Sequence, residues 1–160
     1  MIHSLLQWLR CWLTLTPHFV VGDPSDPYLL RWYVIPRNRW CNIYLHKFLR
    51  SDDDRALHDH PWWFVSLVLW GGYKEHHPCP ICGDSIRHYC FPYHRTAPSI
   101  AFRRAEDAHR VELIDNKPCW TLVITGPKVR EWGFWCPQGW RHWREFTARD
   151  NPGAVGRGCE

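Results

Sequence analysis

The chain has 160 residues, a length that fits one domain with its own buried core. Apolar residues make up 45% of it, which excludes a disordered body, and it contains twelve tryptophans. The formal charge of +4 suits an anionic ligand, but without a long Lys/Arg run it does not indicate nucleic acid. The tryptophans are expected to pack in the core, with stacking on a flat ligand as the alternative.

Residues 1–17 are predicted to form an amphipathic helix that ends at Pro17 and packs on the rest of the chain. Its apolar residues recur at helical spacing: Leu5, Trp8 or Leu9, Trp12 and Leu13. The stretch lacks the cleavage site of a signal peptide and is too short to span a bilayer. A helix lying on a membrane surface is the alternative. We therefore expect a cytoplasmic protein whose eight cysteines are reduced.

Residues 18–147 are expected to form one β-domain, followed by a C-terminal loop or tail over residues 148–160. Short runs rich in aromatic and β-branched residues are bounded by Pro, Gly and Asp, as is typical of strands joined by turns. The runs are Tyr28–Ile35, Asn42–Arg50, Trp62–Tyr73, Ile86–Phe91, Ile100–Arg104, His109–Ile114, Trp120–Thr125 and Glu131–Trp135. Alternating strands and helices are absent, which argues against a nucleotide-binding parallel sheet. The pattern predicts a mainly β fold, an antiparallel sandwich or barrel.

Two histidines lie two positions apart in the segment His58-Asp59-His60. Side chains alternate along a strand, so these two would project to one face, with Asp59 on the other. Imidazole is the commonest side-chain ligand for Zn, Fe, Cu and Ni. About fifty residues later, a turn delivers His109 to a new strand. We expect the three histidines to gather on one divalent transition metal.

This arrangement resembles the cupin superfamily, whose first motif supplies a His-x-His pair and whose second motif supplies one more histidine. The resemblance covers roughly residues 42–126 and implies a single jelly-roll barrel with the metal inside. The glutamate of the first motif would fall at Phe64 or Val65, and the glycines and proline of the second are missing before His109, where Arg104 stands. The chain also resembles small cupin-like proteins of phages and prophages, which would place it in the host cytoplasm.

A three-histidine site without the carboxylate resembles the thiol dioxygenases, in which three neutral imidazoles hold Fe(II) beside open positions for substrate and oxygen. Such ligands leave the full +2 charge on the metal, which favours an anionic substrate or a bound hydroxide. Zinc with three histidines and a water is equally sound chemistry, so the ligands leave Fe or Zn open. Arg104 is a candidate contact for the anionic substrate.

The strand expected at Asn42–Arg50 has two faces: Tyr44, His46, Phe48 and Arg50 on the first, and Ile43, Leu45, Lys47 and Leu49 on the second. The second set looks more like core, so the first is expected to line the cavity. His46 is a candidate base or fourth ligand, or else a hydrogen-bonded structural histidine. Arg50 is a candidate for binding a carboxylate or phosphate, or else pairs with the acidic loop Asp52–Asp54.

Cys79 and Cys82 form a Cys-x-x-Cys turn followed by a glycine, the pattern of a zinc knuckle. A second, structural zinc there would need further ligands, for which the candidates are His76, His77, His88, Cys90 and His94, with His77 or Cys90 preferred. Two unligated thiols in a loop are the alternative.

Two further groups could serve the site from outside the histidine motif. Trp140, His142 and Trp143 could close the barrel mouth and stack on a substrate, or could only complete the barrel. Asp107, two residues before His109, could orient an imidazole or cap a turn.

Three functions remain open. The first is a metal-dependent enzyme, either an oxygenase of the thiol-dioxygenase type or a zinc-assisted hydrolase or isomerase, acting on a small anionic molecule. The second is a protein that binds or sequesters a nucleotide-like ligand without turnover, and the third is a structural module stabilised by metal. The exposed aromatic strands also make a homodimer reasonable.

Overall fold

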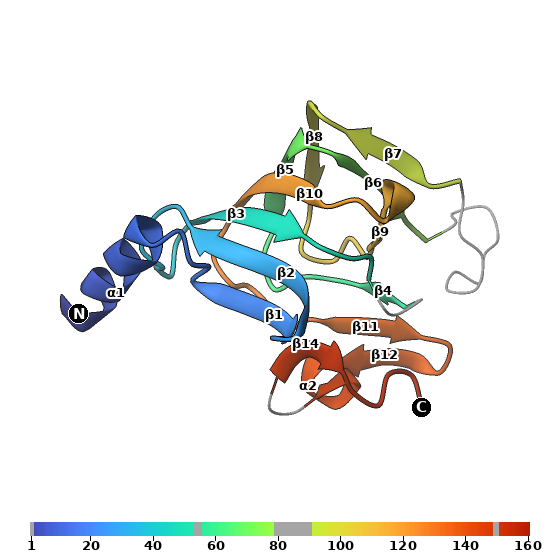
Figure 1. The fold of residues 1–160 in the computed structure, drawn as a ribbon. Helices are drawn as coiled ribbons and strands as arrows, with labels where there is room; N and C mark the ends of the chain where they lie inside the picture. Colours follow the sequence, from blue (N-terminus) through green and yellow to red (C-terminus); the bar gives the residue numbers. More distant parts are fainter. Residues whose placement is uncertain (1, 53–55, 79–90, 149–150) are drawn as a thin grey trace.

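The structure, a computed structural model, describes residues 2–52, 56–78, 91–148 and 151–160 (Figure 1). Cys79, Cys82 and Cys90 therefore lie outside the described residues, as does most of the strand expected at Ile86–Phe91. In the described part of the chain, strands dominate and every pairing between them is antiparallel. The prediction of a mainly β, antiparallel fold with a short N-terminal helix is confirmed.

The elements follow one another in chain order. The helices are α1 (Ile2–Leu13), the short 3-10 turn η1 (Ile114–Asn116) and α2 (Trp143–Phe146). The strands are β1 (Phe19–Asp23), β2 (Asp26–Tyr33), β3 (Asn42–Phe48), β4 (Leu57–His58), β5 (Phe64–Trp70), β6 (Gly72–His76), β7 (Tyr93–Thr96), β8 (Ser99–Arg103), β9 (Arg110–Leu113), β10 (Cys119–Thr125), β11 (Gly133–Cys136), β12 (Gly139–His142), β13 (Thr147–Ala148) and β14 (Asn151–Val155).

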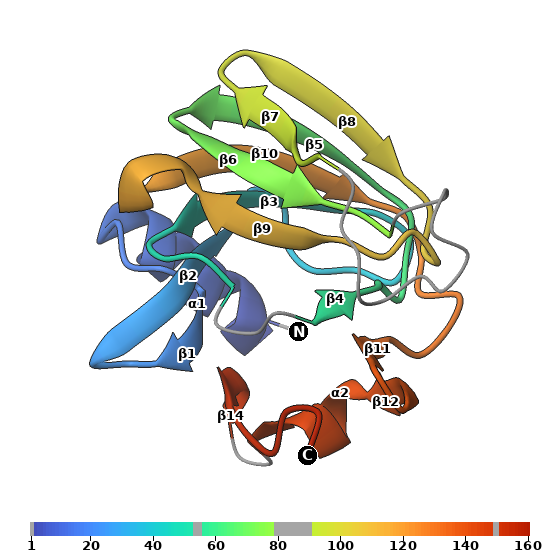
Figure 2. The same ribbon diagram turned by 90° about the vertical axis from the view of Figure 1, so that its right-hand side faces the viewer.

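Two layers of sheet form the barrel. The first is a six-stranded sheet in the order β1-β2-β3-β10-β5-β8. The second combines the sheets β7-β6-β9 and β12-β11-β4, which meet where His58 and His109 pair across an antiparallel bridge. Figure 2 shows β6, β7 and β9 lying over the larger sheet. The space between the layers holds the site described below.

Side chains on alternate positions of the strands fill the interior. One buried cluster consists of Val68, Tyr73, Val111, Leu113 and Cys119, contributed by β5, β6, β9 and β10. Alternation is clearest in β10, where every second residue from Cys119 to Thr125 is buried. The second face of β3, which looked like core in the sequence, instead points outward and is only half-buried. The side chains that face the interior from β3 are Tyr44, His46 and Phe48, on the face that was predicted to line the cavity.

Helix α1 is fastened to the barrel by two indole groups. Trp8 Nε1 and Trp12 Nε1 donate to the same carbonyl oxygen, that of Tyr33 in β2, at 2.6 and 2.9 Å. The leucines of the expected apolar face, by contrast, are exposed: Leu5, Leu9 and Leu13. The surface by which the helix contacts the barrel is therefore narrower than the apolar face predicted from the sequence. Within the described residues, no helix is both long and apolar enough to cross a membrane.

The C-terminal segment differs from the loop or tail expected over residues 148–160. Strand β14 pairs with β13 and lies beside β1, and Cys159 forms a disulfide with Cys136 in β11. Arg141 Nη1 also donates to the carbonyl oxygen of Gly158, at 2.8 Å. The expectation that all cysteines are reduced is wrong for this pair.

Candidate metal centre

The three histidines predicted from the sequence come together at the junction of the two halves of the second sheet. The backbone N–H of His58 donates to the carbonyl of His109 and the reverse bond is also formed, both at 2.9 Å. His60 follows two positions after His58, and its ring lies 5.0 Å from that of His109 between centroids. Asp59 points away and accepts bonds from Arg130, Trp140 and the backbone N–H of Gly133. The two histidines therefore lie on one face and Asp59 on the other, as the alternation of side chains along a strand predicts.

The ring nitrogens of the cluster are close enough to share an ion. One ligand nitrogen from each of His58, His60 and His109 lies within 4.8 Å of the others. The Nε2 atoms of His60 and His109 are 2.8 Å apart. Two nitrogens that bind one ion at 2.0–2.1 Å and at right angles would lie about 2.9 Å apart. The donor set and its spacing therefore fit a divalent transition metal.

A buried carboxylate orients His109. Glu75 in β6 is 1% exposed, and its Oε1 lies 2.8 Å from His109 Nδ1. An ionised carboxylate only accepts, so His109 carries its proton on Nδ1 and presents the Nε2 lone pair to the cluster. Arg95 and Arg103 donate to the same carboxylate at 3.0 and 3.1 Å and neutralise it. Burial raises the pKa of Glu75, but hydrogen bonds from His109 and His77 and the neighbouring positive charges outweigh burial and hold this pKa far below its usual range.

Burial keeps the imidazoles of His58 and His60 neutral. Burial lowers the pKa of His58 to about 4, although Asp52, whose Oδ2 lies 3.8 Å from His58 Nδ1, partly offsets this. Burial, with the positive charges of neighbouring histidines, lowers the pKa of His60 well below 6.5. Neutral imidazole is the form that binds a metal, so the ligand lone pairs are available at neutral pH.

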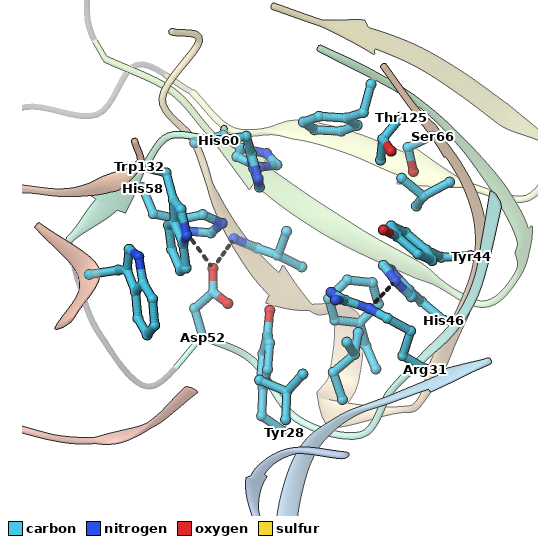
Figure 3. Close-up of a pocket in the computed structure, with 18 of the residues that line it drawn as sticks. Tyr28, Arg31, Tyr44, His46, Asp52, His58, His60, Ser66, Thr125 and Trp132 are labelled. Atoms are coloured by element: carbon cyan, nitrogen blue, oxygen red, sulfur yellow. Dashed lines mark hydrogen bonds and ion pairs between the residues drawn. The ribbon is translucent and has the colours of Figure 1, made fainter. Parts of the chain in front are cut away.

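The cluster forms part of the wall of a cavity of about 490 Å³ inside the barrel (Figure 3). This volume is typical of small-molecule sites. Ten aromatic side chains line the cavity: Tyr28, Tyr44, Phe48, Trp62, Phe64, Tyr73, Trp132, Phe134, Trp143 and Phe146. Ser66, Thr121 and Thr125 add hydroxyl groups from β5 and β10. The cavity therefore offers an apolar enclosure with a few polar groups beside the histidines.

Comparison with known proteins identifies the fold. No protein-family model and no curated protein matches the sequence. Among solved structures, an uncharacterized conserved protein with a double-stranded β-helix domain from Klebsiella pneumoniae subsp. pneumoniae is 17% identical, with a TM-score of 0.50 over 71% of this chain and 89% of that one. Hydroxypropylphosphonic acid epoxidase from S. wedmorenis is 10% identical, with a TM-score of 0.50 over 67% of this chain and 54% of its own. The structure of Fe(II)-HppE with an alternative substrate has the same identity and coverages, with a TM-score of 0.52.

The chain has the cupin fold. The resemblance inferred from the spacing of the three histidines is therefore confirmed at the level of the fold. In this cupin barrel a carboxylate does reach the histidine cluster, but it comes from Glu75 in β6 and contacts an imidazole, while Phe64 and Val65 stand where the motif glutamate was sought.

Of the four residues predicted to line the cavity from the first face of β3, three do so. Tyr44, His46 and Phe48 line the cavity of the cupin barrel, as expected. His46 is fixed by Arg31, whose Nε lies 2.9 Å from His46 Nε2. Burial and the charge of Arg31 lower the pKa of His46 well below 6.5. Since Arg31 can only donate, His46 accepts through Nε2, and that nitrogen is not free to act as a base.

Four other candidates lie away from the cavity. Arg50 contacts Asp26, with 3.6 Å between Nε and Oδ2. Arg104 is exposed at a turn that Asp107 caps, because Asp107 Oδ2 accepts from the Arg104 backbone N–H at 2.8 Å. Trp140 donates to the buried Asp59, and His142 lies 3.2 Å from Glu131. These residues hold loops and strands together, whereas the neighbouring Trp132 and Trp143 line the cavity and stack on each other at 5.8 Å.

Three candidate ligands of the zinc-knuckle hypothesis lie among the described residues: His76, His77 and His94. His76 Nε2 lies 2.9 Å from Glu112 Oε2. His77, a preferred ligand for that site, has its Nε2 3.4 Å from Glu75 Oε2 and 3.2 Å from Arg103. Cys79, Cys82 and Cys90 lie outside the described residues.

Sequence reasoning missed Arg31, Glu75 and Asp52. Arg31 and Glu75 each occupy an inward position of a strand whose inward neighbours are apolar or aromatic, Leu29 and Tyr73 respectively. A single charge at such a position is a signal, since buried charges are rare without a partner or a function. Asp52 was assigned to a solvated loop, but its carboxylate accepts from the Val111 backbone N–H at 2.7 Å and lines the cavity.

Proposed function

We propose that the protein binds one divalent transition metal, Fe or Zn, through His58, His60 and His109 and acts as an enzyme on a small anionic molecule. The observation that carries this proposal is the convergence of three imidazoles, one of them oriented by Glu75, on the wall of a cavity inside the barrel. A metal there would supply Lewis acidity or, in the case of iron, the activation of oxygen. An oxygenase of the thiol-dioxygenase type and a zinc-assisted hydrolase or isomerase are both consistent with this chemistry.

The chain's own residues then have defined tasks. His58, His60 and His109 hold the metal, and Glu75 fixes the tautomer of His109. The aromatic wall, including Trp132 and Phe64, excludes water from the ligand. One protein of the same fold is described with Fe(II), which makes iron the first metal to test.

Capture of a nucleotide-like ligand without turnover is the second candidate. It is favoured by the engagement of His46, whose Nε2 accepts from Arg31 and is therefore not free to act as a general base. A protein that only binds would need the aromatic wall and the anion contact but no base.

Metal analysis of the purified protein tests the proposal. Wild type is expected to carry one equivalent of Fe or Zn that His58→Ala, His60→Ala and His109→Ala each lose, measured by inductively coupled plasma mass spectrometry. His142→Ala removes a histidine outside the cavity and is expected to retain that equivalent. Unchanged metal content in all three cluster variants would refute the site, and an equivalent that survives in them would point to the Cys79–Cys82 loop.

Activity assays then separate the two candidates. Iron together with oxygen uptake in the presence of a thiol supports the oxygenase. Zinc with hydrolysis or isomerisation of a small anion supports the second enzyme class. Metal content without turnover across a panel of anionic metabolites supports capture.

A further inference from the structure

Arg31 is a cation inside the barrel without a carboxylate partner. It lies in β2 and lines the cavity, and no described carboxylate forms an ion pair with it. Asp52 is the acidic residue among the described cavity-lining side chains, and its carboxylate is engaged by the Val111 backbone N–H. A charge removed from water without a counter-charge costs several kcal/mol, typically about 3–5 in proteins. Such an arrangement calls for an anion from outside the chain.

The guanidinium is held in one orientation. Its Nε donates to His46 Nε2 at 2.9 Å, and its central carbon lies 4.9 Å from the centre of the Tyr44 ring. The rings of Tyr44 and His46 stack at 5.6 Å with only 9° between their planes. His46 is therefore a positioning residue for Arg31, and the hydrogen bond through Nε leaves the edge formed by the two terminal nitrogens unoccupied by described residues. That edge presents two parallel N–H groups, which match the oxygens of a carboxylate or phosphate.

A second polar group in the same wall has no partner. Thr121 is 1% exposed, lines the cavity and sits directly opposite His46 in the pairing of β10 with β3. Its Oγ1 makes no hydrogen bond to any described residue. Buried hydroxyl groups are normally satisfied, so an unsatisfied one facing a cavity indicates a ligand atom or a bound water.

Figure 3 places Arg31 and His46 across the cavity from His58 and His60. We propose that Arg31 binds the oxyanion of a small organic ligand, a carboxylate or a phosphate, whose opposite end reaches the histidine cluster. The contact of the ligand with the histidine cluster rests on the proposed function, whereas anion binding by Arg31 does not. The ligand class is thus a compact molecule with an anionic group at one end, an apolar or aromatic body and a donor atom at the other end. The aromatic wall between the two polar ends, with Phe64 and Tyr44, fits that body.

Anion binding to metal-free protein tests the anchor independently of the metal. Benzoate and inorganic phosphate are titrated at constant ionic strength, and the Nε–Hε resonance of Arg31 is followed by NMR. Wild type is expected to show saturable binding of at least one probe, and the stronger probe identifies the anionic group. Arg31→Gln is expected to bind it at least tenfold more weakly, since a hydrogen bond to a charged group contributes about 1.5–3 kcal/mol.

Arg39→Gln is the matched control, because it removes the same charge from a residue that does not line the cavity. It should bind the probes as wild type does. If Arg31→Gln does not fold, as judged by circular dichroism, His46→Leu and His46→Gln replace it. The leucine variant should weaken binding, and the glutamine variant, which keeps an acceptor for Arg31, should restore much of it. Absence of saturable binding to wild type, or equal binding by the Arg31 and Arg39 variants, would overturn the proposal while leaving the metal site untouched.

Discussion

The two faces of the six-stranded sheet contrast in a way that runs against the usual pattern of a folded domain. The inner face of β3, β10 and β5 carries His46, Thr121, Thr125 and Ser66 around the cavity. The outer face carries rows of apolar side chains that cross the strands in register, such as Trp32, Leu45, Leu122, Leu67 and Ile100. The hydroxyl and imidazole groups of these three strands therefore lie on the inner face, among the aromatic side chains of the cavity wall, and the outer face carries none of them.

This contrast is what the proposed ligand would require of the interior wall. A polar group inside a domain contributes little unless its hydrogen bonds are complete. Inside this barrel some are complete, as around Glu75, and others are not, as at Arg31 and Thr121. The half-satisfied groups lie beside the cavity, where a ligand would complete them.

The largest expected effect comes from neutralising the buried carboxylate. Glu75→Gln leaves Arg95 and Arg103 without a counter-charge, so we expect a loss of about 3–5 kcal/mol in the free energy of unfolding, measured by urea denaturation. Metal affinity should also fall by about 10–100-fold, because His109 loses its orienting partner.

Glu112→Gln is the control, because Glu112 lies on the outer face of the paired strands β6 and β9 whereas Glu75 lies on the inner face. Glu112 in β9 pairs with Lys74 at 2.9 Å, but its side chain is 34% exposed. Exposed ion pairs contribute about 0–1 kcal/mol, so this variant should lose no more than that. Equal losses in the two variants would show that inner and outer carboxylates do not differ in the way the structure indicates.

The next effect is the dependence of stability on pH in metal-free protein. The folded-state pKa values of His58, His60 and His46 lie below the unfolded value of 6.5, that of His58 at about 4. The unfolded chain thus binds more protons between these values, and stability is fully present above pH 6.5 and lost as the pH falls through about 4. His58 alone contributes on the order of 3 kcal/mol to this loss.

Urea denaturation at a series of pH values measures the slope. His58→Gln removes one of the titrating groups and should give a shallower dependence than wild type. A slope that is the same in both proteins would mean that His58 is already protonated, or exposed, in the folded state.

Smaller effects on the free energy of unfolding, of opposite sign, are expected from the same substitution at two threonines. Thr121→Val removes a hydroxyl that makes no hydrogen bond, so we expect stability to rise by about 1 kcal/mol. Thr147→Val makes the same chemical change where Oγ1 donates to the Trp143 carbonyl at 2.8 Å, and should cost about 1 kcal/mol. Thermal unfolding of both variants measures the difference. Loss of stability in both would indicate that Thr121 is satisfied by a bound water.

The sequence predicted the parts of this molecule that depend on local periodicity. His58 and His60 are on one face and Asp59 on the other because a strand alternates, and the turn before His109 was visible in its composition. Glu75 and Arg31 were missed because their role depends on which sheet layer faces which, and that is a property of the barrel rather than of either strand. For β3 the sequence placed the first face correctly at the cavity, but the apolar second face was wrongly expected to be core.

Pairings between distant segments were equally out of reach. The disulfide joins residues 23 positions apart, and it forms because the C-terminal segment folds back past α2 onto β11. Nothing in the local sequence of Cys159 indicates that return. Arg50 and Arg104 were selected as cations near the motif, but nearness in sequence did not place either of them in the cavity.

The smallest effect on folding is expected on the outer face. Ile100 in the edge strand β8 is 68% exposed, so Ile100→Lys should change the free energy of unfolding by no more than about 0.5 kcal/mol. The row that it ends continues through the half-buried Leu67 and Leu122, and apolar side chains left partly exposed next to one another mark a candidate interaction site. The homodimer expected from these strands would bury this face, and the lysine would then weaken self-association while leaving the monomer intact. Light scattering coupled to size-exclusion chromatography of wild type and variant measures this. A wild type that is monomeric at all concentrations would refute the homodimer. The exposed apolar side chains of the outer face would then be in contact with water in the native protein, and the contrast between the two faces would concern only the ligand in the cavity.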